Sequence, residues 1–277
     1  MPDRNASRTA IATAYMRAAH QLLDASPHIL EDPIAVTLLG PAATQRIRDT
    51  AENYQTPGRR ALRAHAVLRS RYAEDRLAAS LHNKITQYVI LGAGFDTFGL
   101  RQPAWAHALQ ILEIDHKATQ ERKLSWIAKA GLAIPENVRF AAIDFEHESL
   151  CDGLQRCPTS FNEPTFFSWL GVTMYLKEGD IDAVLRCVAL FPAGSEIVLT
   201  FALPSANGHS SFDQRATLLG EPWMSYFEPA EIEAKLRSAG LSQVEFLSPT
   251  EAEERYFRQR PKDLPLPTRT NIVCATR

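Results

Sequence analysis

Two glycines stand where the first strongly apolar run of the sequence ends. The run Tyr88–Leu91 is followed by Gly92, Ala93 and Gly94, so a buried strand leads directly into a G-x-G turn. A side chain at either glycine would keep the backbone away from a ligand lying across the carboxyl end of that strand. We therefore expect Gly92, Ala93 and Gly94 to form the floor of a cofactor site, although a tight turn without a ligand would leave the same pattern.

Two acids follow at the spacing that ribose recognition requires. Glu113 lies within the next apolar run and Asp115 directly after it, about 20 residues beyond the glycines. A carboxylate at the end of the neighbouring strand can accept hydrogen bonds from both hydroxyls of a ribose. Strand alternation places both acids on one face, and Asp115 is nearer the end of the strand, so we predict that Asp115 binds the ribose.

The position of a third glycine separates two kinds of nucleotide. A dinucleotide site would have glycine at position 97, but Thr97 stands there and Gly99 comes two residues later, so no pyrophosphate clamp is predicted. After the third apolar run, Asp144 can accept a hydrogen bond from an adenine amino group and Phe145 can pack on the ring. A nucleoside without phosphates, S-adenosylmethionine, fits this set of residues.

The elements that must position these residues form an α/β pattern after a helical beginning. Residues 1–85 read as helices at 6–23, after Asp32-Pro33, and at 59–82. From residue 87 onward, short apolar runs alternate with helical stretches, which is typical of a parallel sheet covered on both faces. Residues 203–227 mix loop formers with large aromatics and are expected to form an insertion that folds over the site. We expect strands at 88–91, 109–114, 138–143, 165–169, 196–201, 243–247 and 270–275, and further helices at 117–130, 177–191 and 229–239.

Length and composition limit the classes of protein. The chain has 277 residues, 45% hydrophobic and 22% charged, with a formal net charge of -2, so nucleic acid and anionic membranes are not expected partners. No run is apolar enough to span a bilayer and no secretory signal is visible, so the expected location is the cytoplasm. Seven strands need residues 88–275, so we expect a single domain, 1–277, with residues 1–85 as a helical lid on the core formed by 86–277.

The cysteines give no sign of a metal site or a disulfide framework. They show neither a C-x-x-C pair nor histidine-rich surroundings. We expect small buried side chains and no bound metal. The four residues are Cys151, Cys157, Cys187 and Cys274.

Taken together, these motifs resemble the leucine carboxyl methyltransferase-like branch of the class I S-adenosylmethionine-dependent methyltransferases. The resemblance implies a doubly wound, mostly parallel sheet of seven strands in the order 3-2-1-4-5-7-6, with the seventh strand antiparallel. It also implies that Gly92 lies beneath the methionyl part of the cofactor, Asp115 at the ribose, and Asp144 and Phe145 at the adenine. It rests on Leu91-Gly-Ala-Gly-Phe-Asp96, Glu113-Ile-Asp115, Ile143-Asp144-Phe145, Gly171-Val-Thr-Met-Tyr175-Leu176 and Arg69-Ser-Arg71-Tyr72.

The resemblance further implies an arginine at the cofactor carboxylate, and both Arg69 and Arg71 match. The three-four spacing of Leu62, Ala66 and Arg69 places Arg69 on the inward face of its helix, whereas Arg71 lies about 200° around, so we predict Arg69. Protein carboxyl methyltransferases of the family carry a cofactor-binding acid after the fourth strand, where this chain has Leu170, so the resemblance places Leu170 at the cofactor without the contact of an acid. This departure favours the bacterial relatives that O-methylate small molecules.

The predicted activity is therefore S-adenosylmethionine-dependent O-methylation of a small molecule, such as a natural product. In-line transfer mainly requires that the acceptor oxygen is held against the methyl group. A carboxylate acceptor needs no base, whereas a hydroxyl is helped by one. The catalytic candidates are His209 in the insertion, ahead of His116 and His20, and Tyr175; the candidates for the acceptor pocket are Trp223, Tyr226 and Phe227.

Other functions remain open at this stage. A protein C-terminal carboxyl methyltransferase would need a pocket for a peptide end, and Leu170 argues against it. An NAD-dependent oxidoreductase is disfavoured by the missing third glycine. A non-catalytic nucleoside-binding module would keep the cofactor residues without an acceptor pocket.

Overall fold

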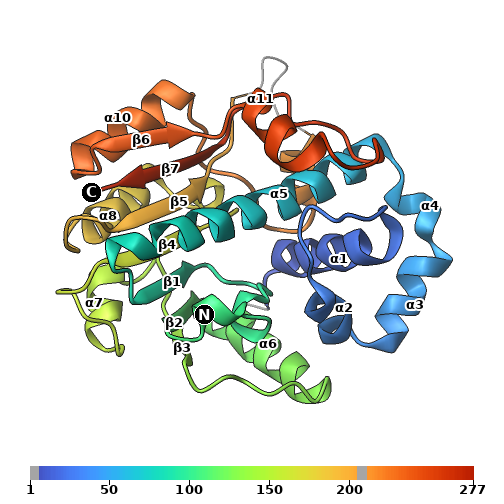
Figure 1. The fold of residues 1–277 in the computed structure, drawn as a ribbon, viewed down its shortest axis with the longest axis horizontal. Coiled ribbons are helices and arrows are strands. Elements are labelled where there is room, and N and C mark those ends of the chain that lie inside the picture. Colours follow the sequence, from blue (N-terminus) through green and yellow to red (C-terminus); the bar gives the residue numbers. More distant parts are fainter. Residues whose placement is uncertain (1–5, 205–210) are drawn as a thin grey trace.

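The computed structural model describes residues 6–204 and 211–277, and within them seven strands form one sheet of order β3-β2-β1-β4-β5-β7-β6 (Figure 1). Strands β1 to β5 are parallel, and β7 runs antiparallel to both β5 and β6. The predicted fold class and strand order are confirmed. The strands are β1 (Gln87–Leu91), β2 (Gln110–Asp115), β3 (Val138–Ala142), β4 (Thr165–Trp169), β5 (Glu196–Thr200), β6 (Gln243–Phe246) and β7 (Ile272–Thr276).

The helices surround this sheet. Figure 1 shows α1 to α4 together beside the sheet and the long α5 running across it. No helix in the described part of the chain is long and apolar enough to cross a membrane. The helices are α1 (Arg8–Leu23), α2 (Pro33–Leu39), α3 (Pro41–Asp49), α4 (Ala51–Tyr54), α5 (Pro57–Ser80), α6 (Lys117–Lys129), α7 (Leu150–Gln155), α8 (Glu178–Val188), α9 (Ser211–Leu218), α10 (Pro229–Ala239) and α11 (Pro249–Ala252), which continues into a π-helical turn at Glu253–Phe257.

Local signals in the sequence explain several helix ends. The Ser7 hydroxyl accepts the backbone N–H of Ala10 at 3.0 Å and starts α1. The Asp32 carboxylate accepts the N–H of Ala35 at 3.1 Å and starts α2, with proline in the first helical position. Gly240 ends α10 with a φ of +103°, which is favourable only for glycine.

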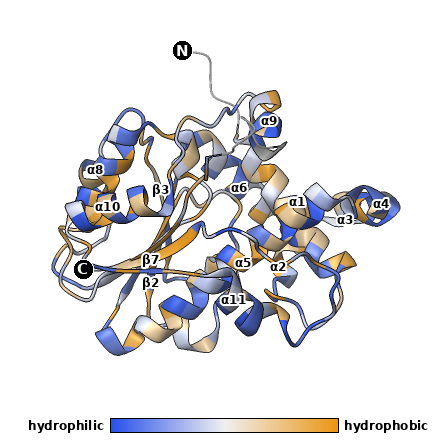
Figure 2. Cartoon of the chain, turned by 90° about the horizontal axis from the view of Figure 1, so that it is seen from above, coloured by the Kyte–Doolittle hydropathy of each residue, from blue (hydrophilic) through white to orange (hydrophobic). Residues whose placement is uncertain are grey.

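The sheet is buried on both faces by apolar side chains. Tyr88 and Ile90 of β1 pack in the cluster that includes α5, while Val89 and Leu91 pack in the cluster with α8 and α10 on the other face. All five residues of β4 are buried, as expected for a parallel strand covered on both sides. Figure 2 shows β7 as one of the most hydrophobic elements, with the hydrophilic α4 at the periphery.

A buried ionic network fastens α1 and α2 to the loop after β1. Arg17 contacts Asp32 at 2.8 Å and Asp96 at 2.6 Å, and donates to the Thr97 hydroxyl at 3.0 Å. Burial alone would raise the pKa of Asp96, but Arg17, Lys123 and other cations outweigh it and hold that pKa well below its usual value. The first two helices are thus held by charge to the loop that carries the two glycines.

The expectation for the cysteines is wrong for one pair. Cys151 in α7 and Cys187 in α8 form a disulfide with their Cα atoms 5.6 Å apart. Their separation of 36 residues leaves no local spacing signal, and only the packing of α7 against α8 brings them together. Cys157 and Cys274 are free, and Cys274 is buried.

Candidate active site

A cavity of about 2140 Å³ lies at the carboxyl ends of β1 to β4, between α1 and α5. Its volume is larger than the roughly 300–1,000 Å³ of a pocket for one small molecule, so two ligands can lie side by side in it. Every residue that the sequence predicted for the cofactor lines this cavity. They are Arg69, Gly92, Ala93, Gly94, Asp115, Asp144, Phe145 and Leu170.

The two glycines of the turn after β1 have positive φ angles, +64° for Gly92 and +52° for Gly94. A Cβ atom at Gly92 would lie 2.3 Å from Cγ2 of Val172, and one at Gly94 would lie 3.2 Å from Cβ of Ala10. Glycine is therefore required here by the backbone conformation and by neighbouring protein atoms, in addition to the ligand approach that the sequence suggested.

Asp115 lies at the end of β2 with both carboxylate oxygens held by the backbone. The N–H of Gly94 donates to Oδ2 at 2.5 Å and the N–H of His116 donates to Oδ1 at 2.7 Å. Burial raises the pKa of Asp115, and these two N–H groups oppose the rise. A carboxylate has about four acceptor sites, so the two that remain can receive a pair of vicinal hydroxyls.

Thr97, which stands where a dinucleotide site would have its third glycine, has a structural role. Thr97 is fully buried and its hydroxyl donates to Asp32 at 2.7 Å. The residues after it form a short 3-10 turn, Phe98–Leu100, so no long helix points its N-terminus at the glycines. The pyrophosphate site of a dinucleotide fold needs that helix end, and the loop after β1 is instead part of the ionic network.

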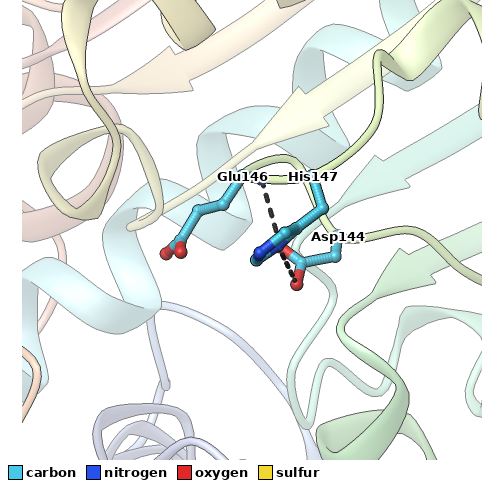
Figure 3. Close-up of side chains that lie close together, drawn as sticks. All are labelled: Asp144, Glu146 and His147. Carbon is cyan, nitrogen blue, oxygen red and sulfur yellow. Dashed lines mark hydrogen bonds and ion pairs between the residues drawn. The ribbon is translucent and has the colours of Figure 1, made fainter. Parts of the chain in front are cut away.

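Asp144, after β3, belongs to a polar turn at the edge of the cavity. Figure 3 shows the His147 ring beside the Asp144 carboxylate; Nδ1 of His147 is 2.9 Å away and the N–H of Glu146 donates at 3.1 Å. Nε2 of His116 lies 3.7 Å from the same carboxylate. The ligand atoms of Asp144, Glu146 and His147 lie within 4.8 Å of one another, but hydrogen bonds within the turn already account for the position of Asp144.

Arg69 approaches the backbone of Gly171, after β4. A Cβ atom at Gly171 would lie 2.4 Å from Nη1 of Arg69, and Gly171 has a φ of +77°. Among the described residues no carboxylate lies within ion-pair distance of Arg69, whereas Arg71 pairs with Asp75 at 2.8 Å on the surface. Burial lowers the pKa of Arg69 to about 10, only partly opposed by Tyr175. An unpaired, partly desolvated guanidinium is suited to receive a ligand carboxylate.

Within the insertion predicted at 203–227, Glu221 lines the cavity and contacts the start of α1. The Glu221 carboxylate accepts the N–H of Arg8 at 2.7 Å and the hydroxyl of Ser7 at 3.0 Å, and it also accepts a short hydrogen bond from the Thr9 hydroxyl. A carboxylate at the first turn of α1 is favoured by the helix dipole. The start of α1 and the insertion therefore meet above the cofactor-facing wall.

The aromatic residues predicted for the acceptor pocket divide into two groups. Trp223 lines the cavity, and its Nε1 is buried without a hydrogen-bond partner in the described structure. Tyr226 is not among the lining residues and donates to Asp213 at 2.5 Å. Phe227 is 3% exposed and packs in the core with Ile232, so the expectation that Tyr226 and Phe227 line the pocket is corrected. Both turn away to anchor the chain that leads into α10.

The catalytic candidates are placed differently from one another. Tyr175 lines the cavity, and burial raises its pKa. His209 lies outside the described residues. His20 is fully buried with both ring nitrogens used, by Asp24 at 2.7 Å and by the N–H of Ile29 at 3.1 Å. His116 caps α6, accepting the N–H of Ala118 at 3.2 Å, so it has a structural role.

Two histidines that line the cavity, His65 and His147, were not predicted. His65 lies one helical turn before Arg69 on α5 and lines the same cavity. The i, i+4 spacing from Arg69 was the available signal, since any residue four positions before an inward-facing arginine also faces inward.

Comparison with known proteins gives the family. The sequence profile of leucine carboxyl methyltransferases matches residues 10–189. The "Putative S-adenosyl-L-methionine-dependent methyltransferase YktD" of Bacillus subtilis (strain 168) is 33% identical, with 95% of each chain covered. A crystal structure of a DUF574 family protein from Streptomyces avermitilis shares the fold, with a TM-score of 0.55 at 13% identity, over 95% of this chain and 96% of that one. The chain belongs to the leucine carboxyl methyltransferase family.

Proposed function

We propose that the protein is an S-adenosylmethionine-dependent O-methyltransferase that acts on a small molecule. The observation that carries this proposal is the unpaired Arg69 in the same cavity as the Gly92-Ala93-Gly94 turn and Asp115. A cation for a carboxylate and an acid for a ribose in one cavity match two polar groups of that cofactor. The name of the Bacillus relative supports the same cofactor.

The residues present fit that cofactor in detail. Arg69 would hold its carboxylate, Asp115 its ribose hydroxyls, and Asp144 with Phe145 its adenine. When bound, the cofactor supplies an electrophilic methyl group on a sulfonium. The chain then has to hold an acceptor oxygen in line with that methyl group and limit the access of water, and the contact of Glu221 with the start of α1 covers part of the cavity for this purpose.

A small acceptor is favoured over a protein tail by two features. The family resemblance implies that Leu170 takes the place of an acid that protein-methylating members carry, and Leu170 packs against the core cluster at α5. The family profile ends at residue 189, before the insertion that carries Glu221 and Trp223. The part of the cavity wall that Glu221 and Trp223 form therefore lies beyond the segment that the family profile matches.

Ligand binding tests the proposal directly. We expect S-adenosylmethionine and S-adenosylhomocysteine to raise the melting temperature, with a gain in unfolding free energy of about 2.7 kcal/mol at 100 times the dissociation constant, and NAD to leave it unchanged. Asp115→Ala and Asp144→Ala should abolish binding in calorimetry while the circular dichroism spectrum is retained. Stabilisation by NAD alone, or normal affinity in both variants, would reject the proposal.

Labelling separates small-molecule from protein acceptors. Incubation of the enzyme with a bacterial lysate and tritiated S-adenosylmethionine should place the label in the fraction that passes a 3-kDa filter. Base-labile label retained on protein would instead identify a protein carboxyl methyltransferase.

A further inference from the structure

His65 occupies a place in the cavity that neither the cofactor residues nor the fold accounts for. It lines the cavity one turn before Arg69, which is about 6 Å along the helix axis. The only hydrogen bond between the His65 side chain and a described residue joins Nε2 to Oδ1 of Asn271, at 3.2 Å. Asn271 directly precedes β7, which lies far from α5 in the sequence.

The surroundings of Asn271 determine which ring nitrogen of His65 carries the proton. The Asn271 side-chain NH₂ donates to the carbonyl of Phe201 at 3.3 Å, and the backbone N–H of Phe201 donates to the carbonyl of Asn271 at 3.2 Å. The amide oxygen Oδ1 is therefore turned toward His65 and can only accept. Nε2 of His65 must be the protonated nitrogen, and Nδ1 carries a lone pair.

We propose that His65 is the catalytic base of this site, and that the methyl acceptor is a hydroxyl, of phenol or alcohol type, whose O–H donates to Nδ1 of His65. Among the described residues nothing donates a hydrogen bond to Nδ1, so it is available to a ligand in the cavity. A carboxylate acceptor would be disfavoured at the same place, because its oxygens would face a lone pair instead of a donor.

The electrostatics of the cavity agree with a neutral imidazole. Burial lowers the pKa of His65 to about 4, and Arg69 lowers it further while Asn271 opposes. Arg69 on the same helix is the charged group that acts on the ring, and no carboxylate among the described residues pairs with His65. A ligand carboxylate bound to Arg69 would offset the charge of Arg69 that acts on the ring.

The proton and charge balance of the step follows from this arrangement. A bond forms between the acceptor oxygen and the methyl carbon while the carbon–sulfur bond breaks, and its electron pair stays on sulfur. The proton of the hydroxyl moves to Nδ1 of His65. The positive charge lost at sulfur is then carried by the imidazolium, which releases its proton to the solvent that reaches the cavity.

Nuclear magnetic resonance of the ¹⁵N-histidine-labelled full chain, saturated with S-adenosylhomocysteine, tests the assignment without turnover. The His65 signals are identified by their loss in His65→Gln. We expect the Nε2–H tautomer, and we expect phenol, used as the probe, to shift the Nδ1 resonance while benzoate does not. An Nδ1–H tautomer, or an Nδ1 resonance that saturating phenol leaves unchanged, would overturn the proposal.

Activity on matched acceptors gives a second readout. With tritiated S-adenosylmethionine and a set of 4-substituted phenols and the corresponding benzoic acids, we expect methylation of phenols that falls at least about 100-fold in His65→Gln. The control His82→Gln changes an exposed histidine outside the cavity and should behave as wild type. Methylation of the benzoic acids alone, or phenol methylation kept within twofold in His65→Gln, would contradict His65 as the base.

The inference rests on the proposed function, and calorimetry with S-adenosylhomocysteine separates the two. Failure of the wild-type protein to bind it would reject the proposed function. Normal binding by wild type and by His65→Gln, together with the negative results above, would reject only the role of His65. Asn271→Ala serves as the positioning variant: it should bind S-adenosylhomocysteine normally and show both His65 tautomers in the ¹⁵N spectrum.

Discussion

Replacing Arg69 by glutamine should weaken the binding of S-adenosylhomocysteine and leave the binding of 5′-methylthioadenosine unchanged. The first ligand has an amino-acid carboxylate and the second lacks that whole group, while both have the same adenine and ribose. Arg69 lines the cavity and no described carboxylate pairs with it. If it exists to receive the ligand carboxylate, only the first ligand should be sensitive to its loss.

The size of the effect follows from the state of Arg69 without ligand. Burial lowers its pKa to about 10 from 12.5, which at about 1.4 kcal/mol per pKa unit corresponds to roughly 3 kcal/mol of unfavourable charge burial. A carboxylate that pairs with the guanidinium relieves part of this, because the site is still reached by solvent. We expect a loss of about 1.5–3 kcal/mol in binding, or roughly 10- to 150-fold in the dissociation constant.

Isothermal titration calorimetry with both ligands measures this difference. The matched control is Arg71→Gln, two residues away on the same helix, where the side chain is 43% exposed and paired with Asp75. We expect normal affinities for both ligands in that variant. The unfolding free energy of Arg69→Gln should not fall, because the variant removes a buried charge that has no partner.

Two outcomes would refute the reasoning. Equal weakening of both ligands by Arg69→Gln would mean that the substitution disturbs the cavity as a whole. Unchanged affinity for S-adenosylhomocysteine would mean that the carboxylate is bound elsewhere.

Three further predictions concern the cofactor acid, the ionic network and pH. Asp115→Asn should lower the affinity for S-adenosylhomocysteine by about 10- to 100-fold in calorimetry. It replaces one of the two oxygens that accept backbone N–H groups by an NH₂ group, and the relief of a buried charge offsets part of that loss, so the unfolding free energy should fall by no more than about 2 kcal/mol; a larger loss would contradict this. Arg17→Met should lower the unfolding free energy in urea titrations by about 3–5 kcal/mol, because it removes the closest cation of the Asp32 side chain, which is only 1% exposed. A loss below about 1 kcal/mol would show that the ionic network contributes little to stability. The pKa of His65 is about 4 in the folded protein and near 6.5 in the unfolded chain, so between these pH values the unfolded state binds more protons and the folded state loses stability as the pH falls. Between pH 7 and pH 5 the unfolding free energy of the wild type should therefore fall by about 1–2 kcal/mol more than that of His65→Gln. Equal losses in the two proteins would contradict the folded-state pKa.

The sheet and the cofactor-facing edge were predictable because their signals are local. A strand buried on both faces must be a continuous apolar run, and the prediction for 165–169 coincides with β4, which is buried throughout. The helix at Pro229–Ala239 is bounded by a proline and a glycine that leave little choice. Gly92, Gly94 and Asp115 follow directly from their strands, so predicting the strands also predicted where these residues meet.

The acceptor side was harder because its contacts join distant parts of the chain. His65 and Asn271 are 206 positions apart, and no periodicity relates them. Trp223 and Phe227 are both aromatic and only four residues apart, yet one lines the cavity and the other packs in the core. Which way each side chain turns is decided by Met174 and Ala202, whose carbonyls accept the backbone N–H groups of this segment.

Helices α3 and α4 were missed for a different reason. The stretch Pro41–Asp49 is polar overall and has Ile47 as its only large apolar side chain, so little apolar surface marks it as a helix, although proline after Gly40 is a typical helix start. Residues of α3 and α4 nevertheless complete the small cluster with α1 through Ile47 and Tyr54. Tertiary packing stabilises these helices more than their own propensity does.

The place of β7 in the sheet has a consequence for the order in which the molecule can assemble. Among the described strands, β6 pairs only with β7, which lies between β6 and β5. On the ribosome, residues 243–246 emerge before 272–276, so β6 has no partner and the edge of β5 stays open until β7 inserts between them. Asn271 arrives with β7. The nascent chain can therefore form the glycine turn and the ribose acid early, but it orients His65 only when the sheet is completed.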